Sequence, residues 1–467
     1  MQTSFRWLPG LALAGAAALA WPLAGQQQKP ESLLDSLLNA GGLNPRESPV
    51  KEYFLRARAF GPVANGAPLA TDWPQFRGLR RDGVSSETGL LKSWPAEGPR
   101  VLWKAPAGEG YSHLAVSRER LFTLYGAGSN DVAVAYDAAT GRPAWMTLLG
   151  PKFINESGGN GPRSTPTVDG DMVYILTPAG RLDALDAADG KKVWERDLIR
   201  ELGVLLPGFG YATSPLVEGG LLLVDVGGAS GKSIAAFDKK TGATVWAAQN
   251  EGAGYSAPIA VTVGGVRQVI FLTSQALLSV SPKDGGLLWR VPWVPESGVN
   301  AATPVFVAPD KIFVSTDDRT GAALFQIKVV DGKVSAGEVW KTRKMKNDFS
   351  SSVLHDGYIY GFDNSVLKAI DVTTGAEAWK QSGFGGGSLI VADGQLVVLS
   401  KACKLSLVEA TPAGYREKGS AQILSAGRCF TAPTLANGRL YLRNEEELLA
   451  LDWTDATPKP AAAKSGR

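Results

Sequence analysis

Along most of the chain, short stretches of alternating apolar and polar residues are separated by turns rich in Gly, Asp and Asn. The stretch Ala184–Leu198 is the clearest unit. Apolar positions alternate through Arg181–Leu185, Asp186 and Gly190 follow, and a second stretch carries Trp194. An Asp at the head of a tight turn accepts backbone N–H bonds, and a Gly supplies the positive φ that closes a short loop. The unit is therefore predicted to be a β-hairpin.

The same spacing returns along the chain in the form Ala-x-Asp-x-x-x-Gly-x-x-x-Trp, and such a repeat indicates a propeller, a solenoid or an array. A degraded copy keeps only Gly285 and Trp289. We interpret the Trp residues as packing residues between neighbouring sheets, because an indole fits between two stacked sheets better than within one. The full copies are Asp137, Gly141 and Trp145; Asp186, Gly190 and Trp194; Asp238, Gly242 and Trp246; and Asp371, Gly375 and Trp379.

Each repeat ends in an outer strand that carries a Trp or a substitute for it. The unit of Trp340 is longer, with an insertion at Asp317–Gly321, and the unit at 386–424 has lost the motif. Seven such strands are predicted, near Trp145, Trp194, Trp246, Trp289, Trp340, Trp379 and Tyr415.

Two incomplete pieces stand at the ends of the repeat region. The strand Arg100–Ala105, with Trp103, has no preceding turn motif, and Thr431–Trp453 supplies three strands without a fourth. Pairing them completes an eighth blade and removes the exposed sheet edges. The predicted fold is all-β: an eight-bladed propeller of four-stranded antiparallel blades, closed by the strand around Trp103.

The regions outside the repeats divide the chain further. Residues 1–25 are predicted to be a signal peptide, with Arg6 followed by an apolar core; an uncleaved anchor is the alternative, but the core is short for a span. Residues 26–71 are predicted to be a poorly ordered linker with weak helices, 72–455 the propeller, and 456–467 a disordered tail. No Cys lies near the cleavage region for lipid attachment. We expect a periplasmic or extracellular monomer with no transmembrane span after signal cleavage.

Composition narrows the function classes. The net charge is only +3, which gives no basis for nucleic-acid binding. His113 and His355 stand alone without metal-ligand spacing, so a zinc or haem site built by the protein is not expected. No metal, cofactor or catalytic residue is predicted.

The four full repeats between 72 and 455 resemble the quinoprotein-type, or PQQ-like, β-propeller repeat family. One branch of that family comprises pyrroloquinoline-quinone-dependent alcohol dehydrogenases; the other is the non-catalytic propeller of the outer-membrane β-barrel assembly machinery, with related secreted propellers. The resemblance to the enzyme branch implies a quinone between a Trp and a disulfide of adjacent cysteines, with Ca²⁺ beside it. Here the only cysteines, Cys403 and Cys429, are far apart in sequence. The chain is therefore placed nearer the non-catalytic branch.

Whether Cys403 and Cys429 pair with each other is left open by the sequence. An oxidising compartment favours a disulfide, but two buried free thiols fit equally well because sequence does not show their separation.

In a propeller, the loops that lead into successive inner strands gather on one face around the axis. Here they carry aromatic, amide and charged residues, including the ranges Asn160–Arg163, Asp348–Phe349 and Arg428–Phe430. Such a mixed lining is typical of ligand sites, although the repeated Gly-Tyr pairs also fit a packing role. The candidate ligand or partner residues at the channel mouth are Tyr111, His113, Arg163, Tyr211, Tyr255, Asn300, Asp348 and Arg428.

Two long connections, Leu149–Ser164 and Asp197–Thr213, are predicted to contact a partner, the second through Val204, Leu205 and Leu206. Two groups of basic residues are interpreted as solvated charge; they are Arg77, Arg80 and Arg81, and Lys341–Lys346.

The leading functional hypothesis is a non-enzymatic scaffold of the bacterial cell envelope that binds an envelope protein or a small ligand. The alternative is an oxidoreductase of alcohols or sugars that uses pyrroloquinoline quinone with Ca²⁺. A hydrolase or lyase has only scattered carboxylates in its favour. Fold alone does not decide among them.

Overall fold

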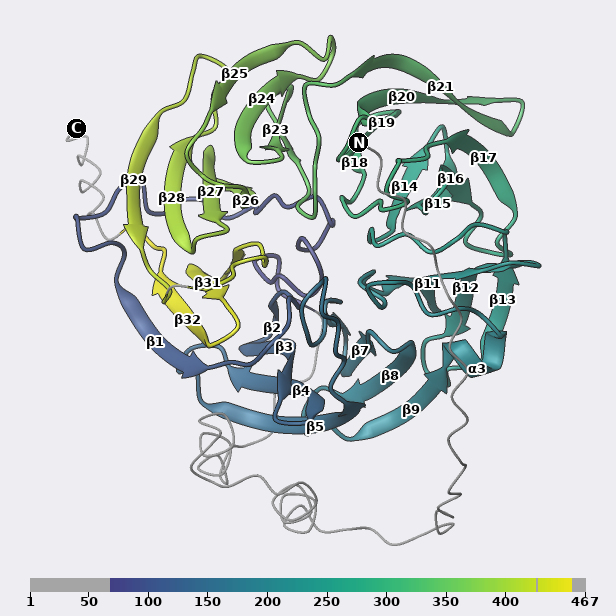
Figure 1. Cartoon of the computed structure of the whole chain (residues 1–467), viewed down its shortest axis with the longest axis horizontal. Helices are drawn as coiled ribbons and strands as arrows, with labels where there is room; N and C mark the ends of the chain where they lie inside the picture. Colours follow the sequence, from purple (N-terminus) through teal and green to yellow (C-terminus); the bar gives the residue numbers. More distant parts are fainter. Residues whose placement is uncertain (1–67, 426, 456–467) are drawn as a thin grey trace, which may run out of the picture. The chain divides into compact units, whose positions relative to one another are not determined.

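The computed structural model describes residues 68–425 and 427–455, which belong to one compact unit. Their strands form eight four-stranded antiparallel sheets around a ring (Figure 1). The predicted eight-bladed all-β propeller is confirmed. The predicted signal peptide, residues 26–67 of the linker and the tail lie outside the described residues and stay predictions.

Blades 1 to 4 each contain four consecutive strands, and the short helix α3 (Leu198–Leu202) follows the last strand of blade 2. The strands are β2 (Ala115–Ser117), β3 (Arg120–Ala127), β4 (Asn130–Asp137) and β5 (Pro143–Pro151); β6 (Thr167–Asp169), β7 (Met172–Leu176), β8 (Arg181–Asp186) and β9 (Lys192–Asp197); β10 (Leu216–Glu218), β11 (Leu221–Gly228), β12 (Lys232–Asp238) and β13 (Thr244–Ala248); and β14 (Ile259–Val263), β15 (Val266–Leu272), β16 (Ala276–Val280) and β17 (Leu287–Pro292).

Blades 5 to 7 follow the same plan, and blade 8 takes its outer strand from the other end of the described chain. The strands are β18 (Val305–Val307), β19 (Lys311–Thr316), β20 (Gly321–Val330) and β21 (Lys333–Thr342); β22 (Val353–His355), β23 (Tyr358–Asp363), β24 (Val366–Asp371) and β25 (Glu377–Gln381); β26 (Gly387–Ala392), β27 (Gln395–Ser400), β28 (Lys404–Glu409) and β29 (Glu417–Gln422); and β30 (Thr434–Ala436), β31 (Arg439–Arg443) and β32 (Glu447–Asp452), with β1 (Val101–Pro106).

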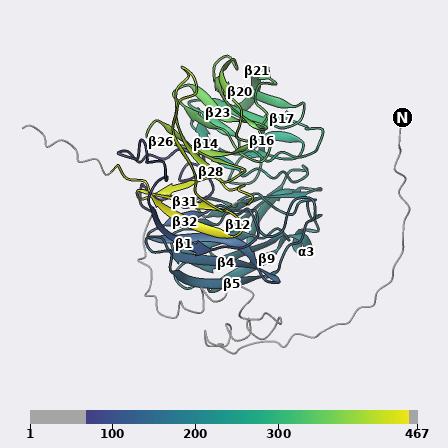
Figure 2. The same cartoon turned by 60° about the vertical axis from the view of Figure 1, so that its left-hand side comes forward.

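The ring is closed by β1, which pairs with β32 in antiparallel register. Trp103 lies opposite Ala450 and Lys104 lies opposite Leu449. Both views show β1 beside β32 and β31 (Figures 1 and 2). The predicted closure by the strand around Trp103 is confirmed.

The repeat residues connect each blade to the next. Trp145 Nε1 donates to the carbonyl of Ala187 at 3.0 Å, and a Cβ on Gly190 would lie 2.6 Å from the Trp145 ring. Gly190 has φ of +73°, which a side chain disfavours. The Asp186 carboxylate accepts the N–H of Ala188 at 2.8 Å. The motif thus shapes the turn and seats the Trp of the preceding blade. The same donor–acceptor relation joins Trp103 to Ala138, Trp194 to Lys239, Trp246 to Pro282, Trp340 to Val372 and Trp379 to Thr411.

The hydrophobic core lies between the blades. Phe122 and Leu124 of blade 1, for example, share a buried cluster with Val173 and Ile175 of blade 2. Burying apolar faces between twisted sheets is the main source of stability in such an architecture.

The sequence misplaced the extra length of blade 5. Residues 317–320 form a turn in which Thr320 N donates to the Asp318 carboxylate at 2.9 Å. The extra residues instead lengthen the hairpin of β20 and β21, which turns at Asp331 and Gly332. Val329 of this hairpin packs on the turn between β14 and β15, where a Cβ on Gly264 would lie 2.9 Å from it. The hairpin therefore reaches across blade 4, and the predicted insertion at Asp317–Gly321 is wrong.

Candidate functional site

The antiparallel order of each blade separates its connections onto two faces. The first and third turns of a blade lie at one end of its strands, and the second turn and the connection to the next blade lie at the other. We call the latter the loop face; its connections are residues 107–114, 152–166, 198–215, 249–258, 293–304, 343–352, 382–386 and, of the last, the described residues 423–425 and 427–433. We call the opposite side the turn face.

Residues 72–91 close the turn-face end of the central channel, and we call them the plug segment. In Figure 1 this purple segment crosses the centre of the ring. Trp73 pairs with Val116 of blade 1, and Val84 forms a parallel bridge with Val391 of blade 7. Leu91 N donates to the carbonyl of Trp453 at 2.9 Å. These contacts therefore tie together blades 7, 8 and 1, which are neighbours in the ring.

Two arginines of the plug segment are buried, which overturns their interpretation as solvated charge. Arg81 is 2% exposed and donates to the carbonyls of Ser214 and Pro258, both at 3.1 Å. Arg77 is 5% exposed and donates to the carbonyl of Ser352 at 2.6 Å. A guanidinium has five donors in a rigid fork, so it satisfies several carbonyls at once.

The neighbouring Arg80 is exposed, as predicted, and pairs with Asp82. Within Lys341–Lys346 the lysines keep exposed surface, whereas Met345 between them is fully buried.

Two of the predicted mouth residues lie within the protein. Tyr211 is 1% exposed and donates to the carbonyl of Val226 at 2.8 Å. Asn300 is fully buried and donates to the carbonyl of Thr273 at 2.7 Å. Both side chains hold loops together and contribute no surface to the mouth.

His113 is half-buried, and its ring lies 4.9 Å from that of Phe76 of the plug segment. Its Nδ1 accepts the N–H of Ala432 at 3.4 Å. Burial, together with the charges of Arg77 and Arg443, lowers the pKa of His113 to about 3. The imidazole is therefore neutral at physiological pH.

The remaining predicted residues, Tyr111, Arg163, Tyr255, Asp348 and Arg428, keep exposed surface on the loop face. The Arg163 guanidinium nevertheless donates hydrogen bonds within its own loop, to the carbonyls of Gly158, Gly159 and Gly161 at 3.0, 2.7 and 2.8 Å. It positions the 152–166 loop. A ligand or partner role for these residues stays a prediction.

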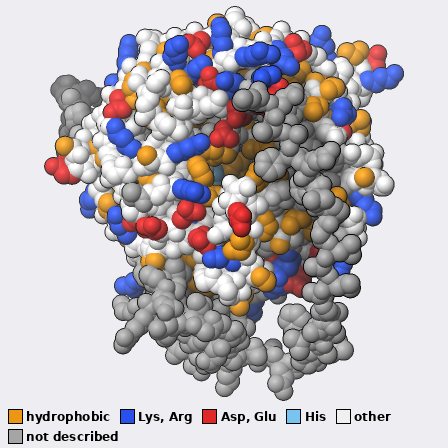
Figure 3. Space-filling model, viewed as in Figure 1, with side chains coloured by type: hydrophobic (Ala, Val, Ile, Leu, Met, Phe, Trp, Pro, Cys, Tyr) orange, Lys and Arg blue, Asp and Glu red, His pale blue; other side chains and the backbone are white. Residues whose placement is uncertain are grey.

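An aromatic cluster stands at the mouth of the channel. The ring of Phe430 lies 5.0 Å from Tyr111 and 4.7 Å from Phe349, between centroids. Lys401 Nζ lies 4.7 Å from the Phe349 centroid and 3.2 Å from the carboxylate of Asp348. The space-filling view shows a hollow at the centre of the ring with hydrophobic side chains around it (Figure 3). Sequence reasoning missed Lys401, which lies on a turn within a blade.

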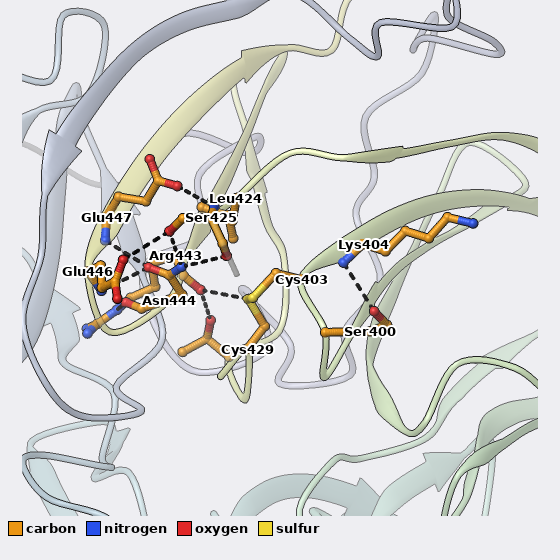
Figure 4. Close-up of a disulfide and its surroundings, with 12 residues drawn as sticks. Ser400, Cys403, Lys404, Leu424, Ser425, Cys429, Arg443, Asn444, Glu446 and Glu447 are labelled. Carbon is orange, nitrogen blue, oxygen red and sulfur yellow. Dashed lines mark hydrogen bonds between the residues drawn. A yellow bond between two sulfur atoms is a disulfide. The ribbon is translucent and has the colours of Figure 1, made fainter. Parts of the chain in front are cut away.

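Cys403 and Cys429 form a disulfide, which settles the alternative that the sequence left open. Their Cα atoms are 5.2 Å apart, and the bond joins the turn between β27 and β28 to the loop that enters blade 8 (Figure 4). Cys429 N also donates to the carbonyl of Lys401 at 3.2 Å. The disulfide therefore fixes the position of Phe430 next to Lys401.

Arg443, beside the disulfide, links blade 8 to blade 1. It is fully buried, and its guanidinium donates to the carbonyls of Leu124 at 2.8 Å and Gly108 at 2.7 Å. Its own carbonyl accepts the hydroxyl of Thr431 at 3.0 Å. The ring is thus held at its closing blade by charge-assisted hydrogen bonds as well as by β1.

The two long connections that were predicted to contact a partner carry exposed apolar side chains. Leu205 is 87% exposed, Ile154 59% and Leu206 46%, whereas Val204 is 6% exposed and packs beside Gly228. Phe209 is also exposed, and we call Ile154, Leu205, Leu206 and Phe209 the docking patch. The prediction of exposure holds for Leu205 and Leu206 and is wrong for Val204.

Local hydrogen bonds hold the docking patch in place. The Asp197 side chain caps α3 by accepting the N–H of Arg200 at 3.0 Å, and Gly203 ends the helix with φ of +65°. Asn155 Nδ2 donates to the carbonyl of Gly208 at 3.0 Å, which joins the two connections. The patch is a preformed surface.

The described residues show no group of three or more His, Cys, Asp or Glu side chains that could hold a metal ion. A shallow cavity of about 230 Å³ is lined by residues that include Trp293, Arg319 and Lys341, and it contains none of the predicted mouth residues. No helix in the described ranges is long and apolar enough to cross a membrane.

The family model described as outer membrane protein assembly factor BamB matches residues 87–208, 205–381 and 363–459, which together span most of the chain. The chain belongs to this family. The prediction that it lies nearer the assembly-type propellers than the quinoprotein alcohol dehydrogenases is confirmed.

Relatives within the BamB family are distant in sequence. The outer membrane protein assembly factor BamB of Burkholderia pseudomallei is 25% identical over 312 residues, covering 64% of this chain and 74% of the relative. That of Yersinia pestis is 23% identical over 364 residues, covering 75% and 77%.

Solved structures share the fold. BamB from Moraxella catarrhalis aligns with a TM-score of 0.53 at 15% identity, over 77% of this chain and 99% of that one. A quinohemoprotein alcohol dehydrogenase from Pseudomonas putida aligns with a TM-score of 0.57 at 13% identity, over 84% and 82%. Because a binding scaffold and an enzyme fit equally well, these alignments establish the architecture alone.

Proposed function

We propose that the protein is a non-enzymatic scaffold of the bacterial cell envelope that takes part in outer-membrane protein assembly by docking a partner protein through its loop face. The observation that carries the proposal is the docking patch. Membership of the BamB family supports the cellular setting, and the predicted signal peptide agrees with it.

The docking patch has the properties of a protein-binding surface. Large exposed apolar side chains that gather on one surface mark interaction sites more often than isolated ones do. Leu205 and Leu206 project from a loop that is anchored on both sides, by the buried Val204 and by the tilted contact of the Phe209 ring with Tyr255 at 5.7 Å between centroids. Because the loop is already ordered, binding costs little conformational entropy.

The test is capture of a partner from a solubilised envelope fraction with the full chain as bait. The Leu205→Ser, Leu206→Ser double variant is expected to lose the partner that the parent chain retains. The matched control is Val193→Ser with Val245→Ser, since these side chains are each 51% exposed but lie on outer strands. Equal recovery by both double variants would contradict docking through the loop face.

The quinone-dependent oxidoreductase remains an untested alternative. In the structure, the disulfide joins cysteines 26 residues apart in sequence, so it is not the bond between adjacent cysteines that the enzyme branch implies. Adding pyrroloquinoline quinone and Ca²⁺ and following thermal unfolding tests this alternative; a rise in Tm with dye reduction by alcohols would favour it over the scaffold.

A further inference from the structure

The seam between blades 4 and 5 carries a tryptophan that the repeat does not require. In most of the blades a repeat Trp donates to a carbonyl of the next blade, but Trp289 Nε1 donates to Gln268 Oε1 of its own blade at 2.7 Å. Trp293, just after β17, joins the two blades instead, because its Nε1 donates to Thr316 Oγ1 of β19 at 2.9 Å. The seam therefore has an aromatic ring in addition to the repeat Trp.

Buried contacts hold the Trp293 indole in one position. The residue is 2% exposed, and its ring stands edge-on to that of Phe325 with the centroids 6.1 Å apart. Thr316, which accepts from the indole, donates to Asn300 Oδ1 at 2.6 Å. Asn300 Nδ2 in turn donates to the Trp293 carbonyl at 3.2 Å. Because this network is closed and buried, the ring is a rigid wall at the loop face.

The cavity of about 230 Å³ beside Trp293, which we call the seam cavity, is bordered by two cations. Lys341 Nζ of β21 lies 5.1 Å from the centroid of the Trp293 ring. Arg319 stands on the turn between β19 and β20, and its side chain is 79% exposed. Among the described residues that line the cavity, only Glu296 is acidic, and its carboxylate lies 3.5 Å from Arg319 Nη1.

The positive charge at the seam cavity is not neutralised within the protein. In the described part of the chain, no carboxylate forms an ion pair with Lys341. The Glu296 side chain is 63% exposed, so water screens its pairing with Arg319. Asp318, on the same turn as Arg319, is engaged in the turn itself, where it accepts the N–H and the hydroxyl of Thr320 at 2.9 and 2.8 Å. The lining of the cavity therefore keeps a net positive charge.

More positive charge lies close to the seam cavity. Arg343 and Lys344, which follow β21, are exposed. The space-filling view shows Lys and Arg side chains gathered at the top of this face, near the part of the ring where Figure 1 labels β20 and β21 (Figures 1 and 3). Charge of one sign around a cavity raises the local concentration of ligands of the opposite sign. The surroundings therefore favour the approach of an anion.

Size and charge together indicate the class of that anion. Pockets that enclose a drug-sized ligand measure roughly 300–1,000 Å³, so the smaller seam cavity takes a small group. Lys and Arg both bind phosphate in proteins, Lys as a point charge and Arg as a fork of donors. A phosphate monoester carries a charge of about −1.5 to −2 at pH 7, so it can pair with Lys341 and Arg319 together. Val294, which is 65% exposed at the cavity, offers apolar contact to the organic part of the ester.

We propose that the seam cavity binds the phosphate group of a phosphate monoester through Lys341 and Arg319, with Trp293 as its rigid wall. The site goes beyond the proposed function, because it lies between blades 4 and 5 and includes no residue of the docking patch. A soluble ester and a lipid headgroup present the same phosphate group. The experiment below therefore tests both sources.

The first measurement is isothermal titration calorimetry of the full chain with glycerol 3-phosphate at constant ionic strength. Acetate, which carries a single charge, is the comparison ligand. The second is flotation of the full chain with phosphatidylcholine vesicles that contain phosphatidic acid, a lipid with the same monoester, and with vesicles of phosphatidylcholine alone. Glycerol 3-phosphate is expected to bind about tenfold more tightly than acetate, because it pairs with two cations.

The two measurements together assign the source of the phosphate. Binding of glycerol 3-phosphate without flotation identifies a soluble ester as the ligand. Flotation that requires phosphatidic acid and is lost with Lys341 and Arg319 identifies a lipid headgroup. Binding of neither probe, or equal binding of acetate and glycerol 3-phosphate, would overturn the proposal.

Variants locate the site. Lys341→Gln with Arg319→Gln is expected to weaken binding about tenfold, because both ion pairs with the phosphate are lost. Both side chains are exposed, so the variant should fold as the parent does. Arg343→Gln with Lys344→Gln is the matched control, since it removes the same charge outside the cavity lining. An equal loss in the control would mean that diffuse charge, and not the seam cavity, binds the anion.

Glu296 provides a test in the opposite direction. Its carboxylate competes with the phosphate for Arg319, so Glu296→Gln is expected to tighten the binding of glycerol 3-phosphate about twofold to fivefold. Weaker binding by this variant would contradict the placement of the phosphate beside Arg319.

The Leu205→Ser, Leu206→Ser variant separates this proposal from the proposed function. It is expected to lose the docked partner and to bind glycerol 3-phosphate as the parent does. If it loses both, the two sites are not independent and the separate phosphate site is refuted. If it keeps both while the Lys341 and Arg319 variant loses the phosphate ester, only the docking proposal fails.

Discussion

The rings of Phe349 and Phe430 are in tilted contact with their centroids 4.7 Å apart, although their loops enter blades 6 and 8, which are not neighbours. The contact shows that the loops converge over the channel. The plug segment occupies the channel, where Arg77 and Arg81 reach carbonyls of Ser352, Ser214 and Pro258 in loop-face connections, and aromatic rings narrow the loop-face end.

The contact between a repeat Gly and the Trp of the preceding blade predicts a large loss of stability for Gly190→Ala. The new Cβ would meet the Trp145 ring at 2.6 Å and would also stand at φ of +73°. Backbone strain and overpacking together are expected to lower the free energy of unfolding by about 2–4 kcal/mol. Denaturant titration measures the change.

The control for that prediction is Gly394→Ala. Gly394 has φ of +72°, yet a Cβ there would have nothing within 4 Å. The control variant should therefore lose only the free energy of unfolding that backbone strain accounts for, about 1–2 kcal/mol. Equal losses for the two variants would mean that the contact with Trp145 contributes nothing.

Removal of the disulfide is the second prediction. The bond closes a loop between residues 26 apart in sequence, so the Cys403→Ser, Cys429→Ser variant is expected to lose about 3–4 kcal/mol of unfolding free energy. Urea titration of the oxidised parent, the reduced parent and the variant measures it. The reduced parent and the variant should agree; an unchanged midpoint in both would show that the bond does not stabilise the blade.

The buried arginine of the plug segment gives the third prediction. Arg81→Met leaves the carbonyls of Ser214 and Pro258 without a donor and should cost about 3–5 kcal/mol. Arg80→Met removes the adjacent exposed ion pair with Asp82 and should lower the free energy of unfolding by less than about 1 kcal/mol. Thermal unfolding of the two variants compares them directly, and similar shifts in Tm would refute the structural role of Arg81.

A buried carboxyl group of β11 predicts a dependence of stability on pH. Burial raises the pKa of Asp225 to about 8, with Glu251 adding to the rise and the N–H groups of Gly254 and Gly227 opposing it. Between about pH 4 and pH 8 the folded chain keeps a proton that the unfolded chain releases. The contribution of Asp225 is therefore greatest below about pH 4 and falls as pH rises to about 8.

Asp225→Asn is expected to flatten this part of the pH profile. The amide retains an oxygen for the N–H of Gly254, which Asp225 accepts at 2.9 Å, and it has no proton to lose. Unfolding free energies at pH 5 and pH 8 should differ less in the variant than in the parent. An equal decline in both proteins would show that Asp225 does not carry the effect.

The sequence predicted the fold well because its repeat residues act locally and identically in every blade. Asp186, Gly190 and Trp194 each serve a turn or a neighbouring strand, so their spacing alone reveals the blade. The extra length of blade 5 was assigned to the wrong place because the sequence shows only how many residues separate successive repeat motifs. A long β20–β21 hairpin and a long turn before β20 give the same number.

The candidate site was harder to predict because exposure depends on contacts between distant segments. Arg81 looks like a surface residue in Arg80-Arg81-Asp82, and only the return of the plug segment through the ring buries it. Tyr211 and Tyr255 both follow a Gly in similar loops, yet one is buried and the other keeps exposed surface. Phe209 was overlooked, although its place between Gly208 and Gly210 is an unusual position for a large apolar side chain.

The central claim, docking of an envelope partner through the loop face, is tested most directly by site-specific photo-crosslinking in the intact cell envelope. A photoreactive residue at Leu205, which is 87% exposed, is predicted to give a discrete crosslink to an outer-membrane assembly protein, while the same residue at Val245 on the outer strand β13 gives none. No crosslink at Leu205, or the same product from both positions, would contradict the account.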